Sequence, residues 1–124
     1  MDKKTFLVVD DEPIICNLLA KIFDHLGYKY YLANNSLSAV ETLKEHLDEI
    51  DIAIVDLIMP ETDGLETIKN LKEIKGDLIA LLSSGQSENS FDNANRTSAV
   101  DGFLSKPYRV EHLTAVLKEY LDKS

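Results

Sequence analysis

Short apolar runs alternate along the chain with longer segments in which apolar residues recur every three or four positions. The runs at 6–9, 52–55 and 78–82 are uninterrupted, which is typical of strands buried on both faces of a sheet. A tyrosine-rich segment at 28–33 has the β-forming composition of a further strand. A brief apolar segment at 102–104 completes five expected strands.

The intervening segments have the spacing of amphipathic helices. Pro13 at a first helical position and Gly27 just past a last one delimit a helix between the first two strands. Ser38 and Glu41 have the spacing of a capping box for the second helix. Apolar faces then continue through the third and final helices. The faces are Ile14, Ile15, Leu18, Leu19, Ile22, Phe23 and Leu26; Leu37, Val40, Leu43 and Leu47; Leu65, Ile68 and Leu71; and Val110, Leu113, Val116, Leu117, Tyr120 and Leu121.

Two further signals concern helix ends and one uncertain helix. Asp63-Gly64 opens the third helix and Gly76 closes it. Residues 87–98 predict only a short, marginal helix, because Asn, Ser, Asp and Thr are weak helix formers.

Five strands that alternate with five helices predict an α/β fold with a parallel sheet and helices on both faces. The 124 residues suffice for one domain with one sizeable core, so we expect a single domain over 1–124. In such sheets, ligands bind beyond the carboxyl ends of the strands. The residues that end the strands are therefore the candidates for function.

Composition limits the class of partner. Asp and Glu number 22 against 13 Lys and Arg, for a net charge of −9, so we expect no direct binding of nucleic acid by this domain. Cys16 is the single cysteine, which excludes an intramolecular disulfide. The chain shows no signal-peptide pattern and no membrane-spanning run. We expect a soluble cytoplasmic protein without membrane contact.

Chemically competent side chains follow the expected strands. Asp10 and Asp11 end the first, Asp56 ends the third, Ser84 ends the fourth and Lys106 follows the fifth. Carboxylates gathered at one edge of a sheet repel one another unless a cation lies among them. Hard oxygen donors favour Mg²⁺, which takes few protein ligands and keeps several waters. The joint placement of these five residues predicts a metal-assisted site.

The chain resembles a receiver domain of the response regulators of two-component signal transduction over essentially its whole length. The matching segments are Val8-Val9-Asp10-Asp11-Glu12, Val55-Asp56-Leu57-Ile58-Met59-Pro60 with Asp63-Gly64, Ser84-Gly85 and Lys106-Pro107. The resemblance implies a doubly wound, flavodoxin-like (βα)5 fold with strand order 2-1-3-4-5. It leaves open whether the receiver stands alone or is part of a hybrid kinase or larger regulator.

The family pattern also implies a role for each matching residue. Asp56 is the expected phosphoacceptor, and Lys106 and Ser84 the expected partners of the phosphoryl oxygens. Mg²⁺, with Mn²⁺ as a substitute, is expected to bind Asp10, Asp11, Asp56 and the backbone carbonyl of Ile58. Such phosphoryl transfer depends on positioning and on neutralising the oxygen charge.

Two assignments stay open. Successive strand side chains face opposite ways, so only one of Ser83 and Ser84 points at the site. We choose Ser84, which lies twenty-eight residues after Asp56 and twenty-two before Lys106 as the family pattern expects, with Ser83 as the alternative. Phe103 resembles the family's switch aromatic, although a plain strand residue explains it as well.

The resemblance implies a switch with protein partners and no enzymatic role beyond its own phosphorylation and dephosphorylation. A histidine kinase or phosphotransfer domain is the expected donor, and an unknown downstream protein or fused output domain the expected receiver of the signal. Phosphorylation is expected to shift the surface of the fourth helix, fifth strand and fifth helix. The serious alternative is a receiver fold that binds proteins without phosphorylation.

Two enzyme or cofactor classes of related chemistry fit poorly. A phosphatase of the haloacid-dehalogenase type requires a second Asp two residues after its nucleophile, where this chain has Glu12 after Asp10. A flavin-binding domain needs Ser, Thr or Gly donors in its first phosphate loop, where Asp10-Asp11-Glu12 would repel phosphate.

Overall fold

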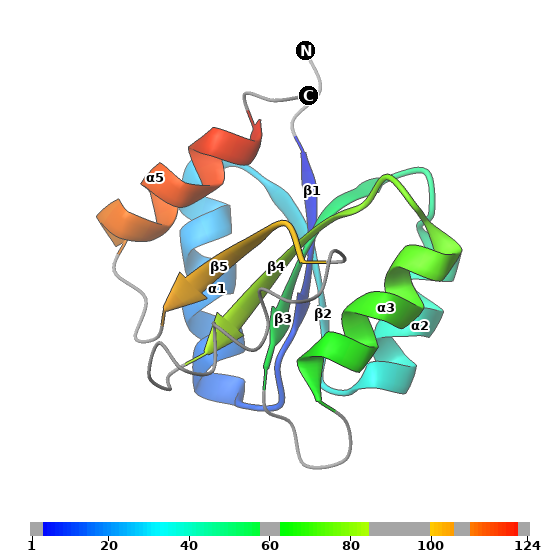
Figure 1. The fold of residues 1–124 in the computed structure, drawn as a ribbon. Helices are drawn as coiled ribbons and strands as arrows, with labels where there is room; N and C mark the ends of the chain where they lie inside the picture. The colour runs from blue at the N-terminus through cyan, green and yellow to red at the C-terminus, as the bar shows by residue number, and fades with distance from the viewer. Residues whose placement is uncertain (1–3, 58–62, 85–99, 106–109, 122–124) are drawn as a thin grey trace.

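Five parallel strands form one sheet in the spatial order β2-β1-β3-β4-β5 (Figure 1). This computed structural model describes residues 4–57, 63–84, 100–105 and 110–121. The strands are β1 (Thr5–Val9), β2 (Lys29–Ala33), β3 (Ile50–Asp56), β4 (Ile79–Ser84) and β5 (Gly102–Ser105). The predicted α/β fold class and the strand order implied by the family pattern are confirmed.

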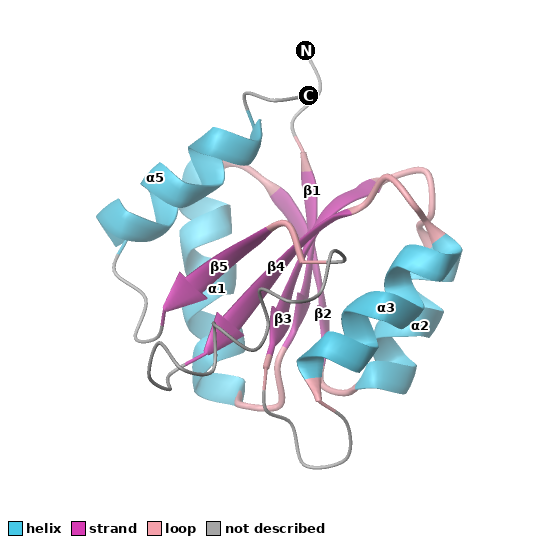
Figure 2. Cartoon of the chain, viewed as in Figure 1, coloured by secondary structure: helices cyan, strands magenta, loops and turns pink. Residues whose placement is uncertain are grey.

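Helices cover both faces of the sheet (Figure 2). They are α1 (Pro13–Leu26), α2 (Ser36–Glu45), α3 (Gly64–Ile74) and α5 (Val110–Leu121). Helices α1 and α5 pack on one face, and α2 and α3 on the other. The marginal helix expected over 87–98 lies outside the described residues. Within the described part of the chain, no helix is long and apolar enough to cross a membrane.

The two layers of core follow from the alternation of side chains along each strand. Leu7 and Val55 belong to the cluster beneath α2 and α3. Val8 and Ile54 belong to the cluster beneath α1 and α5. Each of the central strands β1, β3 and β4 therefore needs apolar residues at consecutive positions, which explains the uninterrupted runs. The same alternation assigns Asp56, two residues after Ile54, to the α1 and α5 face.

Most helix ends agree with the sequence signals. Pro13 is the first residue of α1, and Gly27 ends it in the left-handed conformation with φ of 82°. The Asp63 side chain caps α3 by accepting a hydrogen bond from the Glu66 backbone N–H at 2.8 Å.

The capping-box prediction for α2 is wrong. The N-cap is Asn35, whose side-chain oxygen accepts from the Ser38 backbone N–H at 2.7 Å. Ser38 therefore lies inside the first turn of α2, and its backbone N–H is the group that the cap satisfies. Asn is as good an N-cap as Ser, and here it lies three residues upstream, so the helix begins at Ser36.

Candidate functional site

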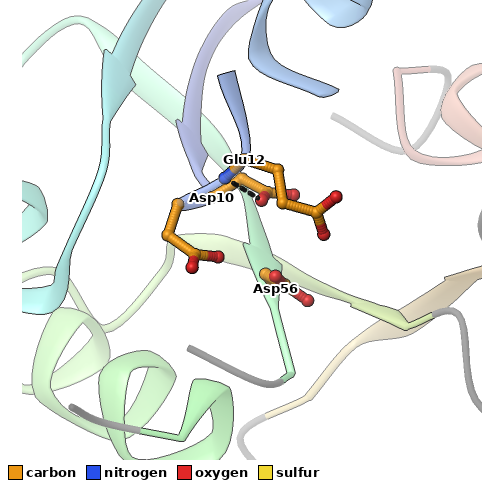
Figure 3. A group of neighbouring side chains, drawn as sticks. Asp10, Glu12 and Asp56 are labelled. Atoms are coloured by element: carbon orange, nitrogen blue, oxygen red, sulfur yellow. Dashed lines mark hydrogen bonds between the residues drawn. The ribbon is translucent and has the colours of Figure 1, made fainter. Parts of the chain in front are cut away.

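Two buried carboxylates lie side by side at the carboxyl end of the sheet. Asp10 directly follows β1 and Asp56 is the last residue of β3, and these strands are neighbours with Val9 paired to Val55. Asp10 is 2% and Asp56 5% exposed. Figure 3 shows both side chains converging from their separate strands. Parallel pairing thus brings together acids that are far apart in the sequence.

Four carboxylates form one cluster at this edge. Asp10, Asp11, Glu12 and Asp56 each offer an oxygen, and these oxygens all lie within 4.8 Å of one another. At an effective dielectric constant of about 20, two unit charges at such a separation repel by about 3.5 kcal/mol. A divalent cation removes this repulsion, and carboxylate oxygens are the ligands that Mg²⁺ prefers. The residues present therefore fit a magnesium site.

Hydrogen bonds to the neighbouring described residues Ala33, Glu12 and Cys16 hold Asp10 in place. Its backbone N–H donates to the Ala33 carbonyl at 3.0 Å, which continues the β1–β2 pairing beyond the strand. Its side-chain Oδ1 accepts from the Glu12 backbone N–H at 2.9 Å, drawn as a dashed line in Figure 3. Its backbone carbonyl accepts from the buried Cys16 thiol at 3.3 Å. The turn between β1 and α1 thus fixes both the backbone and the carboxylate of Asp10.

The backbone directly after Asp56 is also fixed, by two hydrogen bonds of Leu57. The Leu57 N–H donates to the Ser83 carbonyl at 2.7 Å, and the Leu57 carbonyl accepts from the Gly64 N–H at 2.7 Å. Gly64, the first residue of α3, packs directly against the Asp56 backbone. The first residue of α3 therefore packs against the backbone at the end of β3.

The predicted site residues divide into those that the structure brings together and those outside its description. Asp10, Asp11 and Asp56 share one cluster. Phe103 is partly buried in β5 against the α2 and α3 cluster. Ser84 is the last residue of β4, but its side chain is not among those described. Lys106 and Ile58 lie outside the described residues.

Two residues at the site were not singled out as its members. Glu12 contributes a fourth carboxylate to the cluster, which the run of three consecutive acids signalled. Ser83 is fully buried and is the direct partner of Asp56 in the pairing of β3 with β4. The sequence offered Ser83 only as an alternative to its neighbour.

A hollow opens beside the acidic pair. Its volume is about 400 Å³, and Asp10, Asp11, Cys16, Leu32 and Ser38 are among its lining residues. These come from the turn between β1 and α1, the first turn of α1, the end of β2 and the first turn of α2. The acidic cluster therefore borders a space open to solvent on its β2 side.

Comparisons with known proteins agree with this geometry. Residues 6–118 match the family model of the response regulator receiver domain. The chain is 31% identical, over 96% of its length, to the sensor kinase CckA of Brucella abortus, and 33% identical, over 93%, to the transcriptional regulatory protein ZraR of Klebsiella oxytoca. It spans only 13% and 26% of those two relatives.

A solved structure shares the fold and part of the sequence. It is the response regulator TrrA of Thermotoga maritima in complex with Mg²⁺ and BeF. The two are 30% identical with a TM-score of 0.82, and the match covers 95% of this chain and 99% of that one.

Proposed function

Because the chain belongs to the response regulator receiver family, we propose that it is a phosphoacceptor switch in which Asp56 takes up a phosphoryl group. Receivers are signalling phosphoacceptors rather than true enzymes. One observation carries the choice of residue. Asp56 is the carboxylate of β3 in a cluster that Asp10 and Asp11 complete from the neighbouring strand.

In this proposal Asp10, Asp11, Asp56 and the Ile58 carbonyl hold Mg²⁺, for which Mn²⁺ substitutes. The relative from Thermotoga maritima that was solved with Mg²⁺ and BeF supports this choice of cofactor. When bound, the ion neutralises carboxylate and phosphoryl charge.

The transfer step uses the carboxylate of Asp56 as the nucleophile. A lone pair of a carboxylate oxygen forms the new bond to phosphorus, while the bond to the donor's leaving group breaks and its electron pair departs with that group. The burial of Asp56 and its fixed backbone keep the nucleophile in one orientation. Lys106 and Ser84 bind the phosphoryl oxygens, in the roles that the family pattern assigns to them.

Signalling follows from the added charge. Ser84 is drawn toward the phosphoryl group and Phe103 turns inward, which changes the surface formed by residues 87–98, β5 and α5. Phe103 belongs to β5 and is only partly buried against the α2 and α3 cluster, so an inward turn would increase its burial. A histidine kinase or phosphotransfer domain supplies the phosphoryl group.

The same proposal covers organisation and location. Residues 1–124 form one receiver unit that works in the cytoplasm, away from membrane and nucleic acid. A separate downstream protein or a fused output domain receives the signal. Similarity to portions of a sensor kinase and of a transcriptional regulator supports either arrangement.

Labelling with a small phosphodonor tests the function. We expect acetyl phosphate and Mg²⁺ to add one phosphoryl group to the protein, seen by intact mass. Asp56→Asn abolishes the addition, and chelation of Mg²⁺ prevents it. Asp48→Asn, which changes an exposed acid outside the cluster, labels as the wild type does.

Two outcomes would contradict the proposal. Labelling that persists in Asp56→Asn would place the acceptor elsewhere. A wild-type protein that takes no phosphoryl group from acetyl phosphate or from any histidine kinase would favour a receiver fold that binds proteins without phosphorylation.

A further inference from the structure

We propose that Ser83 is a positioning residue for the phosphoacceptor, its hydroxyl donating a hydrogen bond to the carboxylate of Asp56. The inference rests on the proposed function and deepens it. It concerns the serine that the sequence offered only as the alternative to Ser84. Because successive side chains of a strand face opposite ways, Ser83 is the one of the two on the Asp56 face of the sheet, and the role proposed for Ser84 requires its hydroxyl to reach the phosphoryl group from the end of the strand.

The pairing of β3 with β4 places Ser83 beside the acceptor. Asp56 and Ser83 are direct partners, the last pair in a register that runs from Ile52 and Ile79. Side chains of directly paired residues lie on the same face of a sheet, and neighbouring strands are about 4.8 Å apart. A serine hydroxyl at this position is within hydrogen-bonding reach of the paired carboxylate.

The core clusters confirm which face this is. Leu81 and Ile54 are paired and belong to the cluster beneath α1 and α5. Leu82 belongs to the opposite cluster. Two residues after Leu81 along the strand, Ser83 returns to the α1 and α5 face, as does Asp56 two residues after Ile54.

Because Ser83 is buried, its hydroxyl needs a hydrogen-bond partner within the protein. Ser83 is 0% exposed at the end of a strand whose preceding residues are apolar. A buried hydroxyl needs a hydrogen-bond partner within the protein, and an ionised carboxylate is a strong acceptor. Asp56, 5% exposed, is the carboxylate that the pairing places next to it.

The backbone fixes the spacing of the two residues. The Ser83 carbonyl accepts from the Leu57 N–H at 2.7 Å, so the ladder continues one residue beyond Asp56. The strands that carry the carboxylate and the hydroxyl are therefore still hydrogen-bonded to each other one residue after Asp56. The two backbones cannot move apart without breaking this hydrogen bond.

Such a hydrogen bond acts on the chemical step. Of the two Asp56 oxygens, one is needed for the cation and the other for attack on phosphorus. A hydrogen bond from the Ser83 hydroxyl holds the carboxylate in the rotamer that serves both purposes. A larger fraction of encounters with the phosphodonor then leads to transfer. Loss of one neutral donor corresponds to a rate reduction of about three- to tenfold.

The test compares maximal labelling rates at saturating acetyl phosphate and Mg²⁺. Ser83→Ala is expected to lower the maximal rate about three- to tenfold, with unchanged half-saturating concentrations of both. Ser83→Thr retains a hydroxyl and restores most of the rate. Thr5→Ala removes a buried threonine hydroxyl at the opposite end of the sheet and keeps the wild-type rate.

Thermal unfolding with and without Mg²⁺ shows that each variant is folded and keeps its metal response. With that established, a wild-type rate in Ser83→Ala overturns the inference, and so does an equal loss in the Ala and Thr variants. Failure of the proposed function looks different, because the wild type itself then takes no label. Ser84→Ala provides a separate arm, since a loss confined to that variant also overturns the role of Ser83.

Discussion

Gly64 shows how a single residue constrains the backbone of Asp56. A Cβ atom at this position would overlap the Asp56 carbonyl oxygen and lie 2.8 Å from the Leu57 Cα. These are backbone atoms at the end of the strand that carries Asp56, the proposed phosphoacceptor, so no side-chain rotation relieves the overlap. Glycine is required here by close approach and not by a left-handed backbone, since the only positive φ among the described residues belongs to Gly27.

Gly64→Ala is therefore expected to destabilise the fold and to displace Asp56. Overpacking of this kind costs about 1–3 kcal/mol of unfolding free energy. Urea denaturation measures the loss, and the rate of labelling by acetyl phosphate measures the displacement. We expect labelling to fall even under conditions in which the variant is fully folded.

Gly76→Ala is the matched control. Its Cβ would meet only the Lys72 carbonyl oxygen, at 3.9 Å, which is an ordinary contact. We expect nearly wild-type stability and labelling. Equal losses in the two variants would show that the effect of Gly64 has no connection with the Asp56 backbone.

At the scale of elements, a cluster of polar side chains connects β2 to the turn before β3. Its members are Lys29, Tyr31, His46 and Glu49. Glu49 accepts from the Tyr31 hydroxyl and forms an ion pair with Lys29 at 3.0 Å. One of its carboxylate oxygens also lies 3.3 Å from Nδ1 of His46. Tyr31 and His46 stack at 4.0 Å between ring centroids. The hydrogen bond from Tyr31, followed by that from Lys29, lowers the pKa of Glu49 below its usual 4.5.

This shift predicts the sign of a pH effect. Because the pKa of Glu49 is lower in the folded protein than in the unfolded chain, its contribution to stability is complete above about pH 4.5 and is lost as the pH falls through the folded-state pKa. The stability difference between wild type and Glu49→Gln should therefore shrink upon acidification. Urea denaturation from about pH 7 to pH 3 measures it.

The effect is expected to be small, because pairs this exposed to solvent are screened. Glu45→Gln serves as the control, since Glu45 contacts His46 only at 3.9 Å and is more exposed. The difference in unfolding free energy between Glu45→Gln and wild type should vary less as the pH falls. A Glu49→Gln difference that stays constant across this range would contradict the assignment.

At the scale of the whole molecule, the proposed magnesium site predicts that metal binding is coupled to folding. Asp10 and Asp56 come from strands that meet only in the folded sheet, so the unfolded chain offers no such site. Mg²⁺ at one hundred times its dissociation constant should therefore raise the unfolding free energy by about 2.7 kcal/mol. Calorimetry or circular dichroism should show a higher Tm with Mg²⁺.

Asp10→Asn separates repulsion from binding. Without Mg²⁺, removal of one charge from the cluster should raise the Tm, because the remaining carboxylates repel less. With Mg²⁺, the further rise seen in the wild type should be largely lost. Asp77→Asn changes an exposed acid outside the cluster and should keep the wild-type response to the ion. An Asp10→Asn protein that responds to Mg²⁺ as the wild type does would refute the site.

Much of the architecture was predictable because local patterns carry it. Apolar runs predicted buried strands, and Pro13 and Gly27 predicted the ends of α1. The cap of α2 was not predictable in this way, since Ser38 and Asn35 both have N-cap chemistry and the start of the helix decided between them. The strand order needed the family pattern, because sequence spacing does not state which strands are neighbours.

By itself the sequence determined that β1, β3 and β4 are buried on both faces and that acids stand at the carboxyl ends of the first and third strands. These properties reside in residue order and in the period of hydrophobicity, which act over a few positions. Only the tertiary structure decided that Glu12 joins the carboxylates, that Ser83 is the partner of Asp56 and that nothing larger than glycine fits at Gly64. Each depends on the register and separation of strands, which arise when distant segments pack together.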